Sequence, residues 1–237
     1  MHGWGPYSPV GTIIAATEPE APDEPTLTVT GTDVVISWSE PADSGGTGIA
    51  ITAYKIELPL SDGTYKEDLV SCDGSQAALV AALSCTIPMT TLTSDDASTG
   101  FGYAQGEDVT ARVTAINVIG EGEAGPISSS TTVLAQVVPH APTAGPVRAT
   151  GTDEGAIVLG WDALAAPSNG GSTVTSYNLQ WDQGSGTFGV DLTGVSTNYL
   201  LATYTHDAAI VAGGSYGFRY RAANKFGWGE FSPVVTI

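Results

Sequence analysis

Apolar and polar residues alternate along short runs of this chain, and clusters of Gly, Pro, Asp and Ser separate the runs. Because successive side chains of a strand point to opposite faces of a sheet, this alternation predicts β-strands with one buried face. No run has the i, i+3, i+4, i+7 apolar spacing of an amphipathic helix. The predicted strands occupy 26–38 (two strands joined by a turn at 31–33), 51–58, 107–120, 146–161, 174–181 and 215–227. The chain is therefore predicted to be all-β.

The order of these runs occurs twice. Trp38 and Trp161 end the second strand of each unit, and Tyr54 and Tyr177 follow sixteen residues later in both. A length of 237 residues accommodates two domains that can each bury a core. The repeat favours two units over one large domain.

A second kind of repeat is a similarity in sequence between the two ends of the chain. "GWGPYSPVGTI" (3–13) and "GWGEFSPVVTI" (227–237) are identical at eight of eleven positions, with a constant offset of 224 residues. Self-similarity at a fixed offset is typical of a repeat architecture.

The last predicted strand carries the pattern Tyr-x-Phe-x-Tyr-x-Ala-x-Asn-x-x-Gly, which resembles fibronectin type III modules. The matching residues are Tyr216, Phe218, Tyr220, Ala222, Asn224 and Gly227 in the second unit, and Val113, Ala115, Asn117 and Gly120 in the first. "IVAGGSY" (210–216) resembles the family's corner motif, with Ala212 where proline is usual. In the first unit Val109 takes the place of the corner tyrosine, so a corner hydrogen bond is in doubt there.

This resemblance implies an all-β fold of two tandem fibronectin type III-like (immunoglobulin-like) β-sandwiches plus an orphan N-terminal β-strand. In the family the final strand follows the Asn-x-x-Gly turn, so 227–237 is expected to be that strand, and 1–17 the final strand of a preceding module. The expected boundaries are 18–136 for the first module, 137–144 for a proline-rich linker and 145–237 for the second module. An acidic, Cys-bearing type that alternates with a Trp-Gly type resembles large cell-surface proteins of ciliated protists.

Two proline-rich stretches precede the expected modules, at 16–25 and 137–146. Proline-rich connections favour extended, semi-rigid spacers, which predicts modules in line, as in a rod. The N-terminal strand is either an arbitrary cut through a continuous repeat or a strand donated to the sheet of an identical chain.

The net charge of −18 argues against a nucleic-acid partner, because phosphate binding needs clustered Lys and Arg. The charge is uneven: residues 1–140 hold 18 acids and three bases, and the rest hold seven acids and four bases. The excess of acids has two interpretations: it keeps the protein soluble in a crowded surface layer, or it binds divalent cations. No apolar run approaches 18 residues, so neither a membrane-spanning segment nor a signal peptide is expected.

Structural calcium is the cofactor weighed, because Ca²⁺ takes six to eight oxygen ligands. The candidate ligands, at the junction 16–25, are Glu18, Glu20, Asp23 and Glu24. The alternative is a hydrated linker kept open by like charges, with no cofactor.

Cys72 and Cys85 enclose a Gly, Ser and Ala-rich segment, and we expect them to form a disulfide in an oxidising compartment. Buried free thiols are the alternative. A zinc site is disfavoured, because two Cys supply only half of the four ligands that zinc takes.

Four aromatic residues of the repeated motif are candidate interface residues: Trp4, Tyr7, Trp228 and Phe231. Trp and Tyr are favoured at contacts with proteins and sugars, although a final strand could equally pack them against the next linker.

One enzyme signature occurs: "GGSYG" (213–217) fits the nucleophile-elbow pattern, with His206 and Asp207 nearby. The elbow needs a strand-to-helix turn, whereas Ser215 is expected to lead into a strand, so no catalytic residue is assigned. We expect a non-enzymatic structural segment of an extracellular tandem-repeat protein, a spacer, stalk or fibre component. The alternative is a ligand- or glycan-binding module, and an intracellular scaffold of muscle type is disfavoured by the Cys pair.

Overall fold

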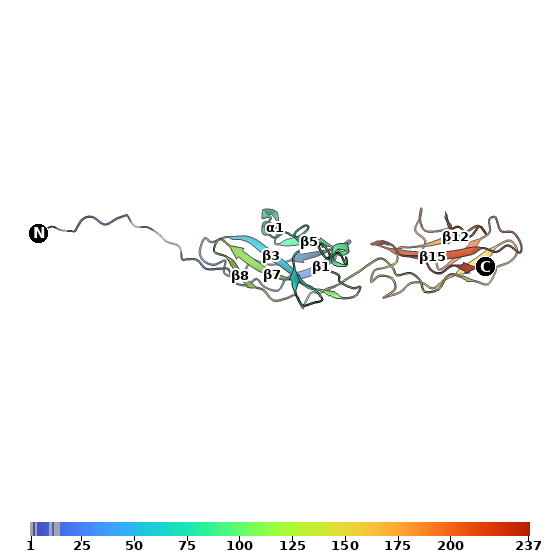
Figure 1. Ribbon diagram of the computed structural model, residues 1–237, viewed down its shortest axis with the longest axis horizontal. Coiled ribbons are helices and arrows are strands. Elements are labelled where there is room, and N and C mark those ends of the chain that lie inside the picture. Colours follow the sequence, from blue (N-terminus) through green and yellow to red (C-terminus); the bar gives the residue numbers. More distant parts are fainter. Residues whose placement is uncertain (1, 3, 10, 12–14) are drawn as a thin grey trace.

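The structure is a computed structural model, and it describes residues 2, 4–9, 11 and 15–237. Two β-sandwiches lie end to end along the long axis, with the N-terminal segment leading away from the first sandwich (Figure 1). The predicted all-β fold of two β-sandwiches is confirmed. Within the described residues, no helix is both long and apolar enough to cross a membrane.

The first sandwich packs a three-stranded sheet, in the order β1-β2-β5, against a four-stranded sheet, in the order β4-β3-β7-β8. A short pair, β6-β9, accompanies them. The strands are β1 Thr26–Thr30, β2 Asp33–Ser37, β3 Ile51–Pro59, β4 Tyr65–Lys66, β5 Ser84–Pro88, β6 Asp108–Val109, β7 Arg112–Asn117, β8 Glu121–Ala124 and β9 Val133–Leu134.

The first core follows from the alternation seen in the sequence. In β2, Val34 and Ile36 are fully buried and their neighbours are only partly covered. Trp38 packs edge-on against Tyr54 at 5.3 Å between ring centroids. The aromatic pair predicted at equivalent positions thus forms part of the contact between the two sheets.

The second sandwich repeats this plan, with β10-β11-β14 packed against β13-β12-β15-β16, and β17 also paired to β15. Its strands are β10 Val147–Arg148, β11 Ile157–Gly160, β12 Ser176–Trp181, β13 Val190–Asp191, β14 Thr203–His206, β15 Gly217–Asn224, β16 Gly227–Trp228 and β17 Val235–Thr236.

The second core is richer in aromatic rings than the first. Trp161 contacts Tyr177 and Tyr220, while Trp181 stacks on Phe218. All five rings are buried. Aromatic side chains bury large areas, so this sandwich has a core of its own without a disulfide.

Two short helices were not predicted: α1 Ala77–Ala82 and α2 Met89–Leu92, both in the first sandwich. Neither is long enough to show a helical apolar period. The run 107–120, predicted as one strand, is divided into β6 and β7, which pair with different strands.

The proline-rich stretches differ from their predicted role as spacers, because each lies along the sandwich that follows it. Pro19, Pro22 and Pro25 are buried at every third residue, the period of an extended polyproline chain. Pro139 and Pro142 repeat the pattern in the second sandwich. Composition marks both stretches as linkers, but the buried prolines make them edge segments.

The predicted orphan strand at 1–17 includes residues 1, 3, 10 and 12–14, which lie outside the described residues. The described residues of this segment, 2, 4–9, 11 and 15–17, are not assigned to a strand.

Candidate functional site

The repeated motif at the C-terminus forms the last strand of the second sandwich, as expected. Ala223 pairs with Trp228, and Phe218 pairs with Val235. Between them, the Ser232 amide donates to the Tyr220 carbonyl at 2.8 Å. Residues 227–237 therefore run antiparallel to β15 along its whole length.

This strand presents its aromatic side chains to two arginines on the outer face of β15. The Arg219 guanidinium lies 4.1 Å from the ring centroid of Phe231 and 4.4 Å from that of Phe188. Arg221 lies 4.3 Å from Phe231 and 5.0 Å from Trp228. These five residues form an alternating row of rings and cations, the Arg–aromatic ladder, in which each cation faces the negative surface of a ring.

The arginines of the ladder are held by amides rather than by acids. Gln180 Oε1 accepts from Arg219 Nη2 at 2.8 Å, and Asn178 Oδ1 accepts from Arg221 Nε at 3.1 Å. Both amides in turn donate to Asp191. Burial, and next the neighbouring Arg221, lower the pKa of the Arg219 guanidinium.

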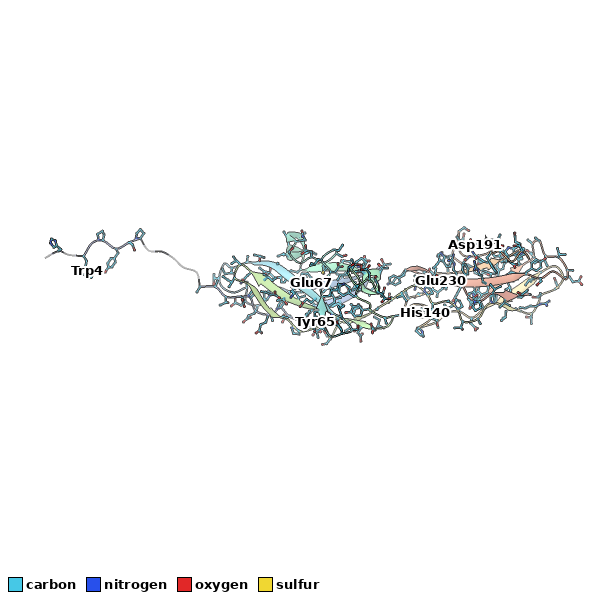
Figure 2. All side chains as sticks on the ribbon, in the orientation of Figure 1. Trp4, Tyr65, Glu67, His140, Asp191 and Glu230 are labelled. Carbon is cyan, nitrogen blue, oxygen red and sulfur yellow. A yellow bond between two sulfur atoms is a disulfide. The ribbon has the colours of Figure 1, made fainter. Side chains whose placement is uncertain are left out.

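The two copies of the motif therefore have different surroundings. Trp228 and Phe231 are partly buried against the arginines of their own sandwich. Trp4 and Tyr7 are fully exposed, and Figure 2 shows Trp4 on the N-terminal segment, apart from both sandwiches. An intermolecular contact through Trp4 and Tyr7 stays a prediction.

An asparagine at the end of β15 fixes the point where the chain joins the second sandwich. Asn224 Nδ2 donates to the Val137 carbonyl at 2.7 Å and to the Asn169 carbonyl at 3.0 Å, while its Oδ1 accepts from the Phe226 amide. The Val137 amide donates to Gly170. A Cβ on Gly170 would lie 2.2 Å from the Val137 carbonyl oxygen, so only glycine allows this approach.

The same arrangement, an asparagine side chain that holds the backbone where the chain joins a sandwich, recurs at the start of the first sandwich. We call it the Asn clamp. Asn117 Nδ2 donates to the Thr17 carbonyl at 2.7 Å and to Ser44, and its Oδ1 accepts from the Ile119 amide. The Thr17 amide donates to Gly45, whose Cβ position lies 2.1 Å from the Thr17 carbonyl oxygen. Thr17 and Val137 are equivalent, and each fixes the chain as it joins a sandwich.

The junction between the sandwiches combines apolar and polar contacts. Phe226, in the turn after β15, packs against the core of the first sandwich. Gln105 Nε2, from the first sandwich, donates to the Pro167 carbonyl at 2.6 Å. The side-chain oxygens of Gln105 and Gln136 are buried without a hydrogen-bond partner within the described part of the chain.

The corner hydrogen bond is present in both sandwiches, made by different residues. In the second, the Val211 amide donates to the Tyr216 hydroxyl at 2.8 Å, as the family resemblance implies. In the first, Val109 has no hydroxyl, and the Ala104 amide donates to the Glu107 carboxylate at 2.7 Å. The doubt raised by Val109 is resolved, since Glu107 satisfies the amide equivalent to that of Val211.

The acidic candidates at 16–25 are not gathered around one point. The Glu24 carboxylate accepts from the backbone amides and hydroxyls of Ser129 and Ser130, and these bonds, led by the Ser129 amide, lower the pKa of Glu24 to about 2. Glu18, Glu20 and Asp23 are exposed. Among the described residues, no group of three or more His, Cys, Asp or Glu could hold a metal ion. A structural calcium stays a prediction, to be tested by a melting shift at millimolar calcium.

The three bases of the first sandwich are already engaged. Lys55 lies 3.3 Å from both Glu57 and Glu121, and Arg112 lies 2.9 Å from Glu57. Lys66 donates to the Gly100 carbonyl at 2.8 Å. Among the described residues only Lys55 and Arg112 are paired with acids, and residues 1–140 hold 18 acids against three bases, which makes the surface of this sandwich strongly anionic.

The predicted disulfide is present. Cys72 and Cys85 are bonded, with their Cα atoms 5.2 Å apart and both side chains buried. The bridge ties the loop that carries α1 to β5, in the three-stranded sheet. It lies far from the Arg–aromatic ladder in sequence and belongs to the other sandwich.

The nucleophile-elbow pattern does not build a catalytic site. Ser215 precedes β15, with no helix after it, so the strand-to-helix turn is absent here. His206 is buried, and its ring packs edge-on against Trp181 at 4.0 Å between centroids. Ser215 and His206, both within the described residues, share no hydrogen bond.

Comparisons with known proteins concern the fold. No family model matches the chain. The crystal structure of chicken CNTN1 FN1-FN3 domains is similar over 93% of this chain and 67% of that one, at 17% identity and a TM-score of 0.39. Domains A168-A170 from titin are similar over 92% of this chain and 61% of that one, at 16% identity and a TM-score of 0.43. At these identities and TM-scores, the similarity concerns the fold and assigns no function to this chain.

Proposed function

We propose that this chain is a non-enzymatic structural segment of an extracellular tandem array, a spacer, adhesive stalk or fibre component. In this array, an acidic, disulfide-bonded sandwich alternates with a sandwich that carries the Arg–aromatic ladder. The repeat is 224 residues long, the offset between the two copies of the terminal motif. The likeness to alternating modules of ciliated protists rests on this alternation alone.

One observation supports the proposal above all: residues 227–237 are the final strand of a sandwich, and residues 3–13 have nearly the same sequence. Trp228 and Phe231 are used to cover Arg221 and Arg219, and Trp4 and Tyr7 are the corresponding rings. A sequence suited to an antiparallel partner with two outward-facing arginines thus occurs at the N-terminus, where its described residues, 4–9 and 11, are not assigned to a strand. We infer that residues 3–13 are the last strand of a preceding sandwich that carries the Arg–aromatic ladder, the second type of sandwich in the array.

The chemistry of the first sandwich supports an extracellular setting. A buried disulfide persists in oxidising compartments and is rare in the cytosol. The anionic surface favours solubility and repels neighbouring copies sideways, which suits a spacer that contacts its neighbours mainly through its ends.

A chain that ends at Phe226 tests the role of the N-terminal segment. Without 227–237, β15 keeps β12 on one side but loses its partner on the other edge, and residues 3–13 of another copy should add to that edge, since both arginines remain in place. Sedimentation should then show oligomers that grow with concentration. The matched control, residues 17–226, lacks both motifs and should stay monomeric. Monomers in both cases would contradict the proposal.

A second candidate function, contact with an external protein or glycan, is favoured by the full exposure of Trp4 and Tyr7. Exposed aromatic rings supply large contact areas with a polar handle. Saturable binding of a glycan or protein to the intact chain, lost in Trp4→Ala and retained in Leu69→Ala, would support this function. Leu69 is also exposed and lies outside the motif.

A further inference from the structure

The apolar tip at the start of the first sandwich is left exposed by the described residues of this chain. Val118 and Ile119, in the turn between β7 and β8, are 75% and 52% exposed. We propose that these two side chains dock onto the C-terminal end of a second-type sandwich from another repeat. The inference deepens the proposed array, on which it rests, by assigning the residues that join one 224-residue repeat to the next.

The internal junction provides the pattern for this contact. Phe226, in the turn after β15, packs against the core of the preceding sandwich, and Gln105 of that sandwich donates to the Pro167 carbonyl of the second. The turn is held by Asn224, whose Oδ1 accepts from the Phe226 amide at 2.8 Å. A side chain on this turn therefore connects one sandwich to the one before it.

The tip of the first sandwich is built in the same way. Asn117 Oδ1 accepts from the Ile119 amide at 2.8 Å, and Asn117 Nδ2 clamps Thr17 as Asn224 Nδ2 clamps Val137. Ile119 therefore holds the position of Phe226. Both are apolar, but Phe226 is covered by a preceding sandwich and Ile119 is not.

The C-terminal end of the second sandwich offers the receiving surface. Gln105 and Gly106, at the internal junction, correspond to Ala212 and Gly213. Beside these two residues lies a cavity of about 430 Å³. Apolar residues of its lining are Ile157, Ile210, Val211 and Ile237, and its charged lining residues are Arg148, Asp153 and Glu154. Val211 is 68% exposed, so an apolar surface with charged neighbours is open to a partner, as in the core and rim of an interface.

Chain length keeps the two ends close together. Ile13 corresponds to Ile237, and only residues 14–16 separate it from the clamped Thr17. A fully extended chain spans at most about 3.6 Å per residue, so these residues cannot hold adjacent sandwiches far apart. The acceptor and the apolar tip are therefore placed within reach of each other at every repeat.

A tandem protein tests the inference: residues 1–237 followed directly by residues 14–237 of a second copy. Spin labels at Thr187→Cys of the leading copy and Ser61→Cys of the following copy report on the new junction. The same two positions within one copy report on the internal junction. We expect narrow distance distributions of similar width for both. A broad distribution across the new junction only would overturn the docking.

The matched variants place V118D and I119D in either copy of the tandem protein. In the following copy they should broaden the distribution across the new junction. In the leading copy no sandwich comes before the tip, so the same substitutions should leave the distribution across the new junction unchanged. Equal melting curves would show that both variants fold. An unchanged width in the following copy would refute the assignment of Val118 and Ile119. Failure here would leave strand addition by residues 3–13 intact, so the two proposals are tested separately.

Discussion

At the scale of single residues, the two sandwiches satisfy the same corner backbone amide with different side chains. Tyr216 in the second sandwich and Glu107 in the first both accept a hydrogen bond from the corner backbone. The sequence revealed that Val109 lacks a hydroxyl. It could not reveal the substitute, because Glu107 is two residues away and its role depends on how the corner folds back.

The corner bond of the second sandwich gives the first prediction. Tyr216→Phe removes the hydroxyl that accepts from the Val211 amide, and one such bond contributes about 1 kcal/mol. The melting temperature of the second sandwich should fall in calorimetry, while that of the first should not. Tyr7→Phe is the matched control, since Tyr7 is fully exposed. Equal melting of the Tyr216 variant and the parent would contradict this role.

His206 should make the second sandwich sensitive to acid. Burial lowers the pKa of His206, with Asp207 and a bond to the Ala208 backbone opposing it. The unfolded chain therefore takes up the proton first. Stability should be full above about pH 6.5, the usual value for unfolded histidine, and should decline as the pH falls through the lower folded-state pKa.

The substitution His206→Phe should remove this decline, because phenylalanine fills the site against Trp181 and Tyr204 without taking up a proton. Thermal melts between neutral and mildly acidic pH measure it. His140→Gln, at an exposed histidine, serves as the control. The same acid sensitivity in the parent and in His206→Phe would rule out His206 as its source.

At the scale of elements, long alternating runs were predictable and short elements were not. β1, β2 and β3 lie where the alternation places them, because one face of each is buried. β4 and β13 have only two residues each, which is too few for any period. They exist because β3 and β12 offer an edge to pair with, and that is a tertiary property.

The candidate site was predictable in part for the same reason. The Asn-x-x-Gly pattern marked Asn117 and Asn224, and the terminal repeat marked Trp228. Arg219 and Arg221 went unnoticed, since their role depends on a final strand that lies beside β15 only after folding. The proline stretches were interpreted as spacers because their burial depends on contacts with the sandwich.

The final strand needs glycine at its third position. A Cβ on Gly229 would lie 2.0 Å from the Pro139 carbonyl oxygen, so Gly229→Ala must displace the proline-rich edge or the strand. We expect a loss of about 1–3 kcal/mol from the second sandwich, as for other overpacked sites. Chemical denaturation measures it. Gly5→Ala, at the equivalent position of the exposed copy, meets nothing within 4 Å and should have no effect. Similar effects of the two substitutions would argue against this packing.

The disulfide should stabilise only the first sandwich. Cys72 and Cys85 are 13 residues apart, and closing a loop of this size contributes about 3 kcal/mol. Replacing both with serine should lower the first calorimetric transition and leave the second in place. A shift of both transitions would mean that the sandwiches unfold as one unit.

At the scale of the whole molecule, the two sandwiches contact each other at their ends, along the long axis. The sandwiches lie end to end (Figure 1), and Phe226 and Gln105 connect them. The charge of −18 is concentrated in the first sandwich, where its few bases are already engaged. We therefore expect like charge to oppose side-to-side approach of copies and contacts between copies to form at the apolar ends.

The most direct measurement of the central claim uses a peptide. The chain 17–226 lacks both copies of the motif, so its second sandwich has no final strand. Adding a peptide with the sequence of residues 3–13 should restore the melting transition of that sandwich nearly as well as residues 227–237 do, and a scrambled peptide should not. Rescue by 227–237 but none by 3–13 would contradict the claim that the N-terminal segment is the closing strand of a second-type sandwich.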